Sequence, residues 1–281
     1  MNIFIVLSCY NTSGITSPYY ISANNAEHNT GLGNMLFQVA SGLYYAYKNN
    51  STLYVPSIET YLRLEKLNKD DTIFRHINTD LLPEYNEDYI NDHPFCLGSI
   101  FDFKFVNNVV LRGYFENITN FNEYKETILE TFRPTQEDKE YLYHKYPILK
   151  DNNLTSIHIR RGKDFEKIFP IEDLNNKDTE MLRLLDHMIK VKNIQNVFVL
   201  TNDHSHCIKL FNKEKYKTLT FYYSTERDYY DIWMISLIKN NIVSGSTLAW
   251  WGSYLNENID RYIIMSNQMG TRTNLDWVIV C

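Results

Sequence analysis

The pattern of hydrophobic and polar positions divides this chain into short strands and amphipathic helices. Residues Asn2 to Leu7 form a nearly continuous apolar run, which predicts a buried first strand. A polar stretch follows, and after Gly31 and Gly33 apolar side chains recur at helical spacing. These positions are Leu36, Val39, Ala40, Leu43 and Tyr47. A second strand is predicted from Thr52 to Val55, so the chain opens with a strand, a glycine loop, a helix and another strand.

The middle of the chain, residues 57–108, is less regular and gives no clear element. Beyond it, Val109 to Tyr114 is predicted as a strand, and two helices follow from Asn120 to Phe132 and from Thr135 to Tyr146. A proline lies just beyond each of these helices. The polar run Lys150 to Asn153 comes next. It is the expected boundary between a first domain of residues 1–150 and a second domain of residues 151–281.

The second half alternates regularly between strands and helices. The predicted strands are Leu154 to Arg160, Asn196 to Thr201, Leu219 to Tyr222 and Asn241 to Ser244. The predicted helices are Thr179 to Lys192, Ser205 to Asn212, Asp228 to Lys239 and one that starts near Ser246. Such alternation is typical of a parallel sheet covered on both faces. The fold class is therefore α/β, and we expect two Rossmann-like domains facing each other across a cleft.

Composition narrows the class of protein. The chain has 281 residues, of which 44% are hydrophobic, so it can form packed cores and is not a disordered protein. A net charge of −6, with no basic run, argues against a general nucleic-acid binder. The four cysteines show no C-x-x-C spacing, which favours a reducing compartment over a disulfide scaffold or a zinc site. The sequence contains no apolar run long enough to span a bilayer and no signal peptide, so we expect a cytoplasmic protein, with peripheral membrane association left open.

The most informative segment is His158-Ile159-Arg160-Arg161-Gly162-Lys163-Asp164-Phe165. It places two guanidinium groups beside a glycine where a predicted strand ends. Arginine matches phosphate oxygens with a rigid fork of donors, and open α/β sheets bind ligands at the carboxyl ends of their strands. A phosphate-bearing substrate is the first interpretation, and a salt-bridged arginine pair facing solvent is the alternative.

Two other predicted strands end in residues that could serve the same substrate. Ser246 or Thr247 can cap a helix whose backbone N–H groups meet an anion, or can simply be an ordinary cap. Asp203 could accept hydrogen bonds from a guanine edge or from ribose hydroxyls, or could cap the helix that follows. Two anion-binding features in one domain favour a diphosphate. His204 and His206 are not spaced as metal ligands and are interpreted as surface residues.

The chain contains no Asp-x-Asp triplet. Glycosyltransferases that hold a diphosphate through a divalent metal generally need such carboxylates. We therefore expect no metal and no other cofactor, with arginine and helix N-termini stabilising the leaving diphosphate.

Five segments, in the same order along the chain, resemble the α-1,2-fucosyltransferase family (glycosyltransferase family 11). The segment from His158 to Phe165 looks like the family's His-x-Arg-Arg-Gly-Asp-Tyr hallmark. The other four are Gly31-Leu32-Gly33-Asn34-Met35-Leu36-Phe37-Gln38, Leu111-Arg112-Gly113-Tyr114-Phe115-Glu116, Thr201-Asn202-Asp203 with Cys207, and Asp231 to Ser236 together with Trp250-Trp251-Gly252. In this chain Lys163 stands between Gly162 and Asp164.

The resemblance implies a GT-B-like fold, in which residues 1–150 form the acceptor-side domain and residues 151–281 bind the GDP-sugar. It also implies inverting, metal-independent transfer of L-fucose from GDP-fucose to a galactose-type glycan in an α-1,2 linkage. Arg161 would neutralise the departing GDP, while Asp164 or Glu116 would take the proton of the acceptor hydroxyl. Residues implied to bind the substrate are Asn34, His158, Arg160, Asp203, Ser246 and Thr247. The family's animal members carry an N-terminal membrane anchor, and because no such segment is expected here, the chain resembles the soluble or peripheral bacterial and viral members.

Two alternatives stay open. Fucose or another GDP-sugar could be transferred to a different hydroxyl. The chain could also be a catalytically silent module that binds a sugar nucleotide or a glycan. In each case the expected partners are a GDP-sugar and a glycan or glycoconjugate, and not nucleic acid.

Overall fold

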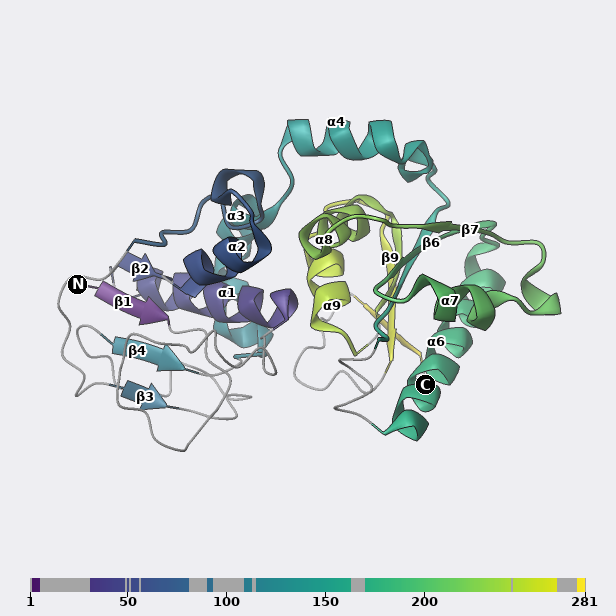
Figure 1. Ribbon diagram of the computed structural model, residues 1–281, viewed down its shortest axis with the longest axis horizontal. Helices are drawn as coiled ribbons and strands as arrows, with labels where there is room; N and C mark the ends of the chain where they lie inside the picture. Colours follow the sequence, from purple (N-terminus) through teal and green to yellow (C-terminus); the bar gives the residue numbers. More distant parts are fainter. Residues whose placement is uncertain are drawn as a thin grey trace. The chain divides into compact units, whose positions relative to one another are not determined.

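The computed structural model describes residues 2–5, 31–48, 50, 52–55, 57–80, 90–92, 109–112, 115–162, 170–243, 245–266 and 277–280. The chain divides into two compact units, Met1–Arg133 and Pro134–Cys281. Helix α4 (Gln136–Lys145) and the 3-10 turn η6 (Pro147–Lys150) thus belong to the second unit, although both precede the boundary expected from the sequence. Figure 1 shows the elements of each unit.

The N-terminal unit contains a parallel sheet with the strand order β2-β1-β4-β3. Its strands are β1 (Asn2–Ile5), β2 (Thr52–Tyr54), β3 (Ile90–Asp92) and β4 (Val109–Arg112). The apolar run at the N-terminus and the segment from Thr52 are strands, as the sequence predicts. Strand β3 lies within residues 57–108, where no clear element was predicted, and it has only three residues.

One long helix accounts for much of the core of this unit. Helix α1 (Leu32–Lys48) packs against β1 and β2 and is buried along almost its whole length. The remaining elements are α2 (Ser57–Glu65), η1 (Lys69–Asp71), η4 (Ile118–Asn120), η5 (Asn122–Tyr124) and α3 (Lys125–Phe132). The predicted helix from Asn120 to Phe132 is therefore η5 followed by the shorter helix α3.

The C-terminal unit contains a parallel sheet of six strands in the order β10-β9-β8-β5-β6-β7. The strands are β5 (Thr155–Ile159), β6 (Asn196–Thr201), β7 (Thr220–Tyr223), β8 (Asn240–Val243), β9 (Tyr262–Ser266) and β10 (Val278–Val280). Read from the β7 edge and numbered along the chain, the order is 3-2-1-4-5-6, the arrangement of a Rossmann domain. The predicted α/β arrangement with a parallel sheet is confirmed for this unit, while β9 and β10 were not predicted.

Helices cover both faces of this sheet. Helices α6 (Ile171–Lys192) and α7 (His204–Phe211) lie on one face, and α8 (Asp228–Leu237) and α9 (Thr247–Tyr254) pack together on the other, as Figure 1 shows. A further 3-10 turn, η7 (Glu214–Tyr216), precedes β7. Helix α6 begins eight residues before the predicted start at Thr179, in the segment that carries Asp178.

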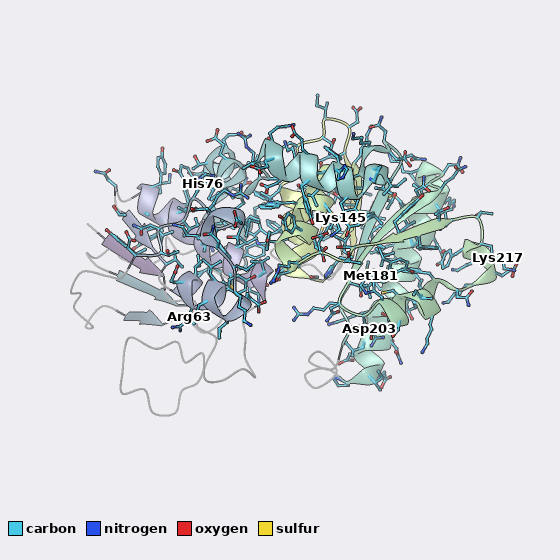
Figure 2. All side chains as sticks on the ribbon, turned by 45° about the horizontal axis from the view of Figure 1, so that its top comes forward. Arg63, His76, Lys145, Met181, Asp203 and Lys217 are labelled. Atoms are coloured by element: carbon cyan, nitrogen blue, oxygen red, sulfur yellow. The ribbon has the colours of Figure 1, made fainter. Side chains whose placement is uncertain are left out.

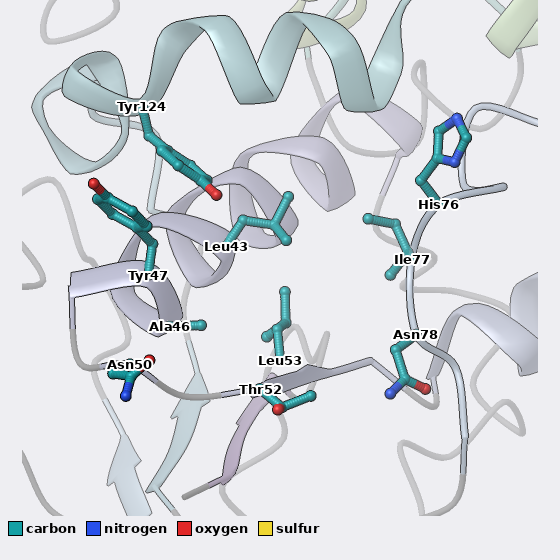
Figure 3. Close-up of a pocket in the computed structure, with 10 residues that line it drawn as sticks. All are labelled: Leu43, Ala46, Tyr47, Asn50, Thr52, Leu53, His76, Ile77, Asn78 and Tyr124. Carbon is teal, nitrogen blue, oxygen red and sulfur yellow. The ribbon is translucent and has the colours of Figure 1, made fainter.

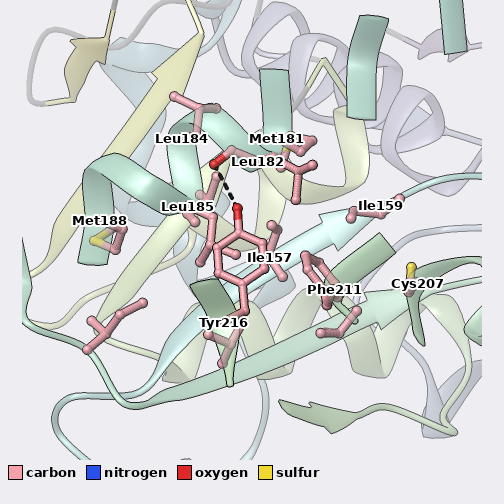
Figure 4. Packing of buried hydrophobic residues seen from close by; sticks show 14 of the residues in the cluster. Ile157, Ile159, Met181, Leu182, Leu184, Leu185, Met188, Cys207, Phe211 and Tyr216 are labelled. Carbon is pink, nitrogen blue, oxygen red and sulfur yellow. Dashed lines mark hydrogen bonds between the residues drawn. The ribbon is translucent and has the colours of Figure 1, made fainter. Parts of the chain in front are cut away.

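The core beneath α6 and α7 is formed by every second residue of the strands and by a stripe of residues three to four positions apart on the helix. Alternate residues of β5 and β6, such as Ile157 and Val199, meet a stripe of α6 that contains Leu184, Leu185 and Met188, and all five are fully buried. Figure 4 shows Ile157 together with the three residues of α6. Burying one such aliphatic side chain stabilises the fold by about 1.5–3 kcal/mol. This packing fixes the position of the first crossover helix on the sheet.

Buried asparagines hold the central strands on the other face. The Asn241 side-chain amide donates to Ser156 Oγ at 2.8 Å and to the backbone oxygens of Ile235 and Ile238 at 3.1 and 3.0 Å. Asn256 donates to Asn241 Oδ1 at 2.8 Å. Because buried polar groups are costly unless they are hydrogen-bonded, this network fixes β5, β8 and the end of α8 relative to one another.

Candidate active site

The strand order of the C-terminal sheet identifies one edge as a binding edge. The chain leaves β5 toward β6 and later returns to place β8 on the opposite side of β5. The carboxyl ends of β5 and β8 therefore flank the topological switch point, where open α/β sheets bind their ligands. The described residues that follow these strands are 160–162 after β5 and 245–247 after β8, with 202–203 after the neighbouring β6.

Arg161 lies at this edge but its side chain turns inward, toward α6. Its guanidinium Nη2 is 2.5 Å from Asp178 Oδ2 and 3.2 Å from Asn175 Oδ1, and only 3% of the side chain is exposed. Its backbone N–H donates to Asn202 Oδ1 at 2.8 Å, which ties the end of β5 to the end of β6. The buried Nε has no hydrogen-bond partner among the described residues.

Asp178 joins three elements at a single carboxylate oxygen. Oδ2 of Asp178 accepts from Arg161 and also lies 2.7 Å from Nε2 of His206 on α7. The Asp178 side chain is 11% exposed and that of His206 is 31% exposed. A carboxylate held between a guanidinium and an imidazole fixes the arginine side chain and offsets its buried charge.

The neighbouring residues His158 and Arg160 differ from Arg161 in their surroundings. Arg160 is exposed, whereas His158 is buried within β5. Burial, with a smaller contribution from the nearby charge of Arg160, lowers the pKa of His158 to about 3. His158 is therefore neutral at physiological pH, and its buried Nδ1 has no hydrogen-bond partner among the described residues.

Gly162 provides the turn that follows the arginine pair. Its φ is +113°, a backbone conformation that residues with a Cβ atom rarely adopt. The glycine is thus required for the direction in which the chain leaves Arg161. Asp164, a candidate base by its position in the motif, lies outside the described residues.

The ends of β6 and β8 carry the other predicted residues of this unit. Asp203 caps α7, because its Oδ1 accepts from the backbone N–H of His206 at 2.9 Å and from Ser205 Oγ at 2.8 Å. These hydrogen bonds, the backbone bond first, lower the pKa of the Asp203 carboxyl. Ser246 occupies the N-cap position of α9 but makes no side-chain capping bond, contrary to the cap expected there, and Thr247 is the first residue of that helix.

The two remaining candidates lie in the N-terminal unit. Asn34 is in the first turn of α1, half-buried, and its backbone N–H donates to Gly31 O at 2.9 Å. Glu116 is half-buried and follows Phe115, whose φ is +50°. Helix α1 and the segment after β4 both start beyond carboxyl ends of parallel strands, so these two residues share one edge of the N-terminal sheet.

Sequence reasoning missed the residues that hold Arg161. In α6 the buried positions Leu174, Asp178, Met181 and Leu185 follow helical spacing. An aspartate on an otherwise apolar stripe is a signal for a buried partner, and the expected helix began one residue too late to include it. His206, interpreted as a surface residue, bonds that same aspartate.

A second buried carboxyl was also missed as a feature of this edge. Asp231, on α8, accepts a short hydrogen bond from Ser224 Oγ at the end of β7. Burial raises the pKa of this carboxyl well above its usual value. The backbone N–H of Glu226 donates to the same Ser224 hydroxyl at 3.1 Å, so the turn after β7 is held by one serine.

Two classes of feature are not found in the described part of the chain. Its His, Cys, Asp and Glu side chains form no group of three or more that could hold a metal ion. None of its helices is both long enough and apolar enough to cross a bilayer.

The chain is similar in sequence to two curated proteins of Escherichia coli. It is 24% identical over 237 residues to the O-antigen biosynthesis glycosyltransferase WbnK, covering 72% of each chain. It is also 24% identical over 253 residues to an α-1,2-colitosyltransferase, covering 80% of this chain and 84% of the other.

The fold is similar to that of a solved enzyme. A crystal structure of NodZ α-1,6-fucosyltransferase soaked with GDP-fucose matches with a TM-score of 0.50 and 11% sequence identity. The match covers 90% of this chain and 92% of NodZ, so the two proteins share a fold over most of their length.

The profile of one family covers nearly the whole sequence, from residue 2 to residue 274. The segments that resemble α-1,2-fucosyltransferases all lie inside this match. The chain belongs to glycosyl transferase family 11.

Proposed function

We propose that this protein transfers L-fucose from GDP-fucose to a hydroxyl of a galactose-type glycan and forms an α-1,2 linkage. The observation that carries the proposal is the arginine pair at the switch point of the C-terminal sheet, in a chain of glycosyl transferase family 11. The C-terminal unit would bind the GDP-sugar, and the N-terminal unit would present the acceptor. A GT-B arrangement, with the two Rossmann-like domains facing across a cleft, is part of this proposal.

The reaction would be a single displacement with inversion at the anomeric carbon. The acceptor oxygen forms a bond to C1 of fucose while the bond from C1 to the β-phosphate oxygen breaks, and its electron pair leaves with GDP. The acceptor proton passes to a carboxylate, for which Asp164 and Glu116 are the candidates. The charge that develops on the diphosphate is the quantity that the site has to stabilise.

The geometry suggests different parts for the two arginines. Arg160 is exposed beyond the end of β5 and can meet a phosphate directly. Arg161 is held by Asp178 and adds its remaining Nε donor from the buried side. Ser246 and Thr247, at the start of α9, would add backbone N–H donors across the switch point, and no metal would be needed.

Other residues of the C-terminal edge would complete the donor pocket. His158, neutral and fixed in β5, would shape its wall, and Asp203 would lie near the nucleotide. From the N-terminal unit, Asn34 would face the cleft. A GDP-sugar donor is in keeping with a cytoplasmic protein, soluble or attached peripherally to a membrane.

A second donor is supported by one of the relatives. Colitose is L-fucose without its 3-hydroxyl group, and a similar chain is named an α-1,2-colitosyltransferase. A pocket that accepts fucose can hold the same ring without that hydroxyl. Transfer of colitose from GDP-colitose is therefore the second candidate.

One assay separates these possibilities. The purified protein is incubated with GDP-fucose or GDP-colitose and a panel of β-galactosides in EDTA, and NMR of the product gives its linkage and anomeric configuration. Fucose transfer in an α-1,2 linkage supports the first proposal, and transfer from GDP-colitose alone supports the second. Strict dependence on manganese contradicts the metal-free mechanism, and binding of GDP-sugar without turnover on any acceptor contradicts transfer.

Variants link the activity to the candidate site. We expect Arg160→Ala and Arg161→Ala to abolish or strongly reduce transfer. Arg183→Ala removes an arginine from the surface of α6, where it pairs with Glu180, and is the matched control. Equal activity in all three variants would show that the arginine pair does not serve the reaction.

A further inference from the structure

The N-terminal unit carries a surface pocket that none of the proposed catalytic or donor-binding residues lines. Its volume is about 400 Å³, within the range of pockets that hold small ligands. Figure 3 shows Tyr47 and Tyr124 on one side and His76, Ile77 and Asn78 on the opposite side, with Leu43 and Leu53 between them. Ala46, Asn50 and Thr52 complete the lining.

The aromatic side of the pocket is an exposed and anchored platform. The rings of Tyr47 and Tyr124 are stacked, with centroids 4.5 Å apart and an angle of 21° between their planes. Tyr47 is 59% exposed, so part of its ring is accessible to a ligand. Next to Tyr124 in the chain, the carboxylate of Glu123 accepts from Lys48 Nζ at 2.8 Å and from the hydroxyl of Tyr44, so it ties η5 to α1.

The other sides supply neutral polar groups. The side chains of Asn50, Thr52, His76 and Asn78 offer amide, hydroxyl and imidazole donors and acceptors around an apolar floor. Among the described lining residues there is no lysine, arginine or carboxylate. A pyranose ring has a face of C–H groups and a rim of hydroxyls, so an aromatic surface beside neutral hydrogen-bonding groups matches both parts of it. An anionic ligand would find no cationic side chain in this lining, and a fully apolar ligand would leave the polar groups of the lining without partners.

The position of the pocket separates it from the edge that carries Asn34 and Glu116. It lies where α1 ends and β2 begins, whereas Asn34 is in the first turn of α1, at the other end of that helix. Both Asn34 and Tyr47 lie on α1, and a helix rises about 1.5 Å per residue, so about 20 Å separates these two residues along the helix axis. A sugar in the pocket is thus not the sugar that would react near Asn34.

We propose that this pocket binds a neutral sugar unit of the acceptor glycan at a distance from the unit that receives the transferred sugar. This proposal rests on the proposed function, because it takes the acceptor to be a glycan. A glycan that contacts the protein at two points presents its reacting sugar at a higher effective concentration, so the protein would prefer longer acceptors. The Tyr47 and Tyr124 rings supply the stacking surface, and Asn78 and His76 the facing hydrogen bonds.

Binding without donor tests the pocket independently of transfer. Saturation-transfer NMR and calorimetry are run with a β-galactoside series from the methyl monosaccharide to a tetrasaccharide. We expect Tyr47→Ala to weaken tetrasaccharide binding by about tenfold, as loss of an aromatic anchor does, and Tyr47→Trp to restore it. Tyr141→Ala, which removes an exposed tyrosine from the other unit, is the matched control.

The outcomes decide the proposal. Wild-type protein that binds no member of the series, or Tyr47→Ala protein that binds the tetrasaccharide as the wild type does, overturns it. Equal weakening for the monosaccharide and the tetrasaccharide also overturns it, because the pocket would then not be a second contact. Tyr124→Ala is an independent variant, and since Tyr47 is exposed, Tyr47→Ala is expected to fold even where Tyr124→Ala does not. If Tyr47→Ala weakens tetrasaccharide binding but the wild type transfers sugar from no donor, the proposed function is wrong while the glycan-binding pocket is supported.

Discussion

The guanidinium of Arg161 and the carboxylate of Asp178 form a buried ion pair, with 2.5 Å between Nη2 and Oδ2. The pair joins the end of β5 to the second turn of α6, and His206 adds α7 through the same oxygen. Arg160, the preceding residue, is exposed. Two adjacent arginines at a switch point thus have different surroundings, one fixed inside the fold and the other at its surface.

Removing the carboxylate should destabilise the C-terminal unit strongly. Asp178→Ala leaves the buried guanidinium of Arg161 without its counter-charge, and such a change costs about 3–5 kcal/mol. We expect urea denaturation to show a loss of this size in the free energy of unfolding. Asp178→Asn keeps one acceptor and the side-chain volume, so its loss should be smaller.

A double-mutant cycle isolates the pair. Arg161→Met combined with Asp178→Leu removes both charges and replaces them with apolar groups of similar size, so the double variant should be more stable than Asp178→Leu alone. Additive effects of the two substitutions would mean that the pair is not coupled. As a control, Glu214→Ala removes the exposed partner of Lys217 and should cost less than about 1 kcal/mol.

The sequence was sufficient to predict the candidate site but not its supporting contacts. Arg160, Arg161 and Ser246 were placed at one sheet edge because strand and helix periods mark where each strand ends. The partners of Arg161 were not predictable in this way, because the contact of Asp178 with it depends on how α6 lies across the sheet. The sequence allowed two interpretations of Asp203, a nucleotide contact or a helix cap. In the structure its side chain caps α7.

The elements that were missed are short or lack a clear period. Strands β3 and β10 have three residues each, too few for alternation to show. Helix α6 starts at Ile171, but its first turns contain charged and amide residues such as Asn175 and Asn176, which weakened the apolar stripe. These stretches become ordered through packing on neighbouring strands, which a local pattern does not record.

Replacing Gly162 should strain the turn after the arginine pair. At φ of +113° an alanine Cβ meets its own backbone, and we expect Gly162→Ala to lose about 1–3 kcal/mol of stability. A turn that relaxes to a negative φ would also shift the arginine segment, so transfer activity should fall with stability. Thermal unfolding and initial rates measure the two effects.

The turn after β8 offers a glycine for comparison. At Gly245 an added Cβ would meet no atom within 4 Å, so Gly245→Ala should change the unfolding temperature little. The same stability in Gly162→Ala and Gly245→Ala would show that the positive φ is not required.

His158 should make the protein sensitive to acid between pH 6.5 and about 3. Its pKa is about 3 in the folded protein and 6.5 without the fold, so in this window the unfolded chain binds a proton that the folded chain does not. The stabilising contribution of the neutral ring is present above pH 6.5 and is lost, by about 1.4 kcal/mol per pH unit, as the pH falls toward 3.

A difference measurement separates His158 from the carboxyl groups. The free energy of unfolding is measured by urea titration at several pH values for the wild type and for His158→Gln. We expect the gap between them to be constant above pH 7 and to shrink as the pH falls. His144→Gln changes an exposed histidine of α4, and its difference from the wild type in the free energy of unfolding should change much less with pH. A constant gap for His158→Gln down to pH 4 would contradict the lowered pKa.

Gly252 permits the close contact between α8 and α9. A Cβ added there would lie 2.5 Å from Ile235 Cβ and 2.6 Å from its Cγ2, distances that packed carbon atoms do not adopt. Gly252→Ala must therefore push the helices apart, and we expect it to lose about 1–3 kcal/mol although alanine favours helices. Because α9 begins directly after Ser246, its displacement should also raise the KM for the GDP-sugar. Ile235→Ala in the same chain removes Cγ2 but keeps the nearer Cβ, so it should not restore the wild-type unfolding temperature. If Gly252→Ala unfolds at the wild-type temperature and keeps the wild-type KM, the close packing of these helices neither limits stability nor positions the start of α9.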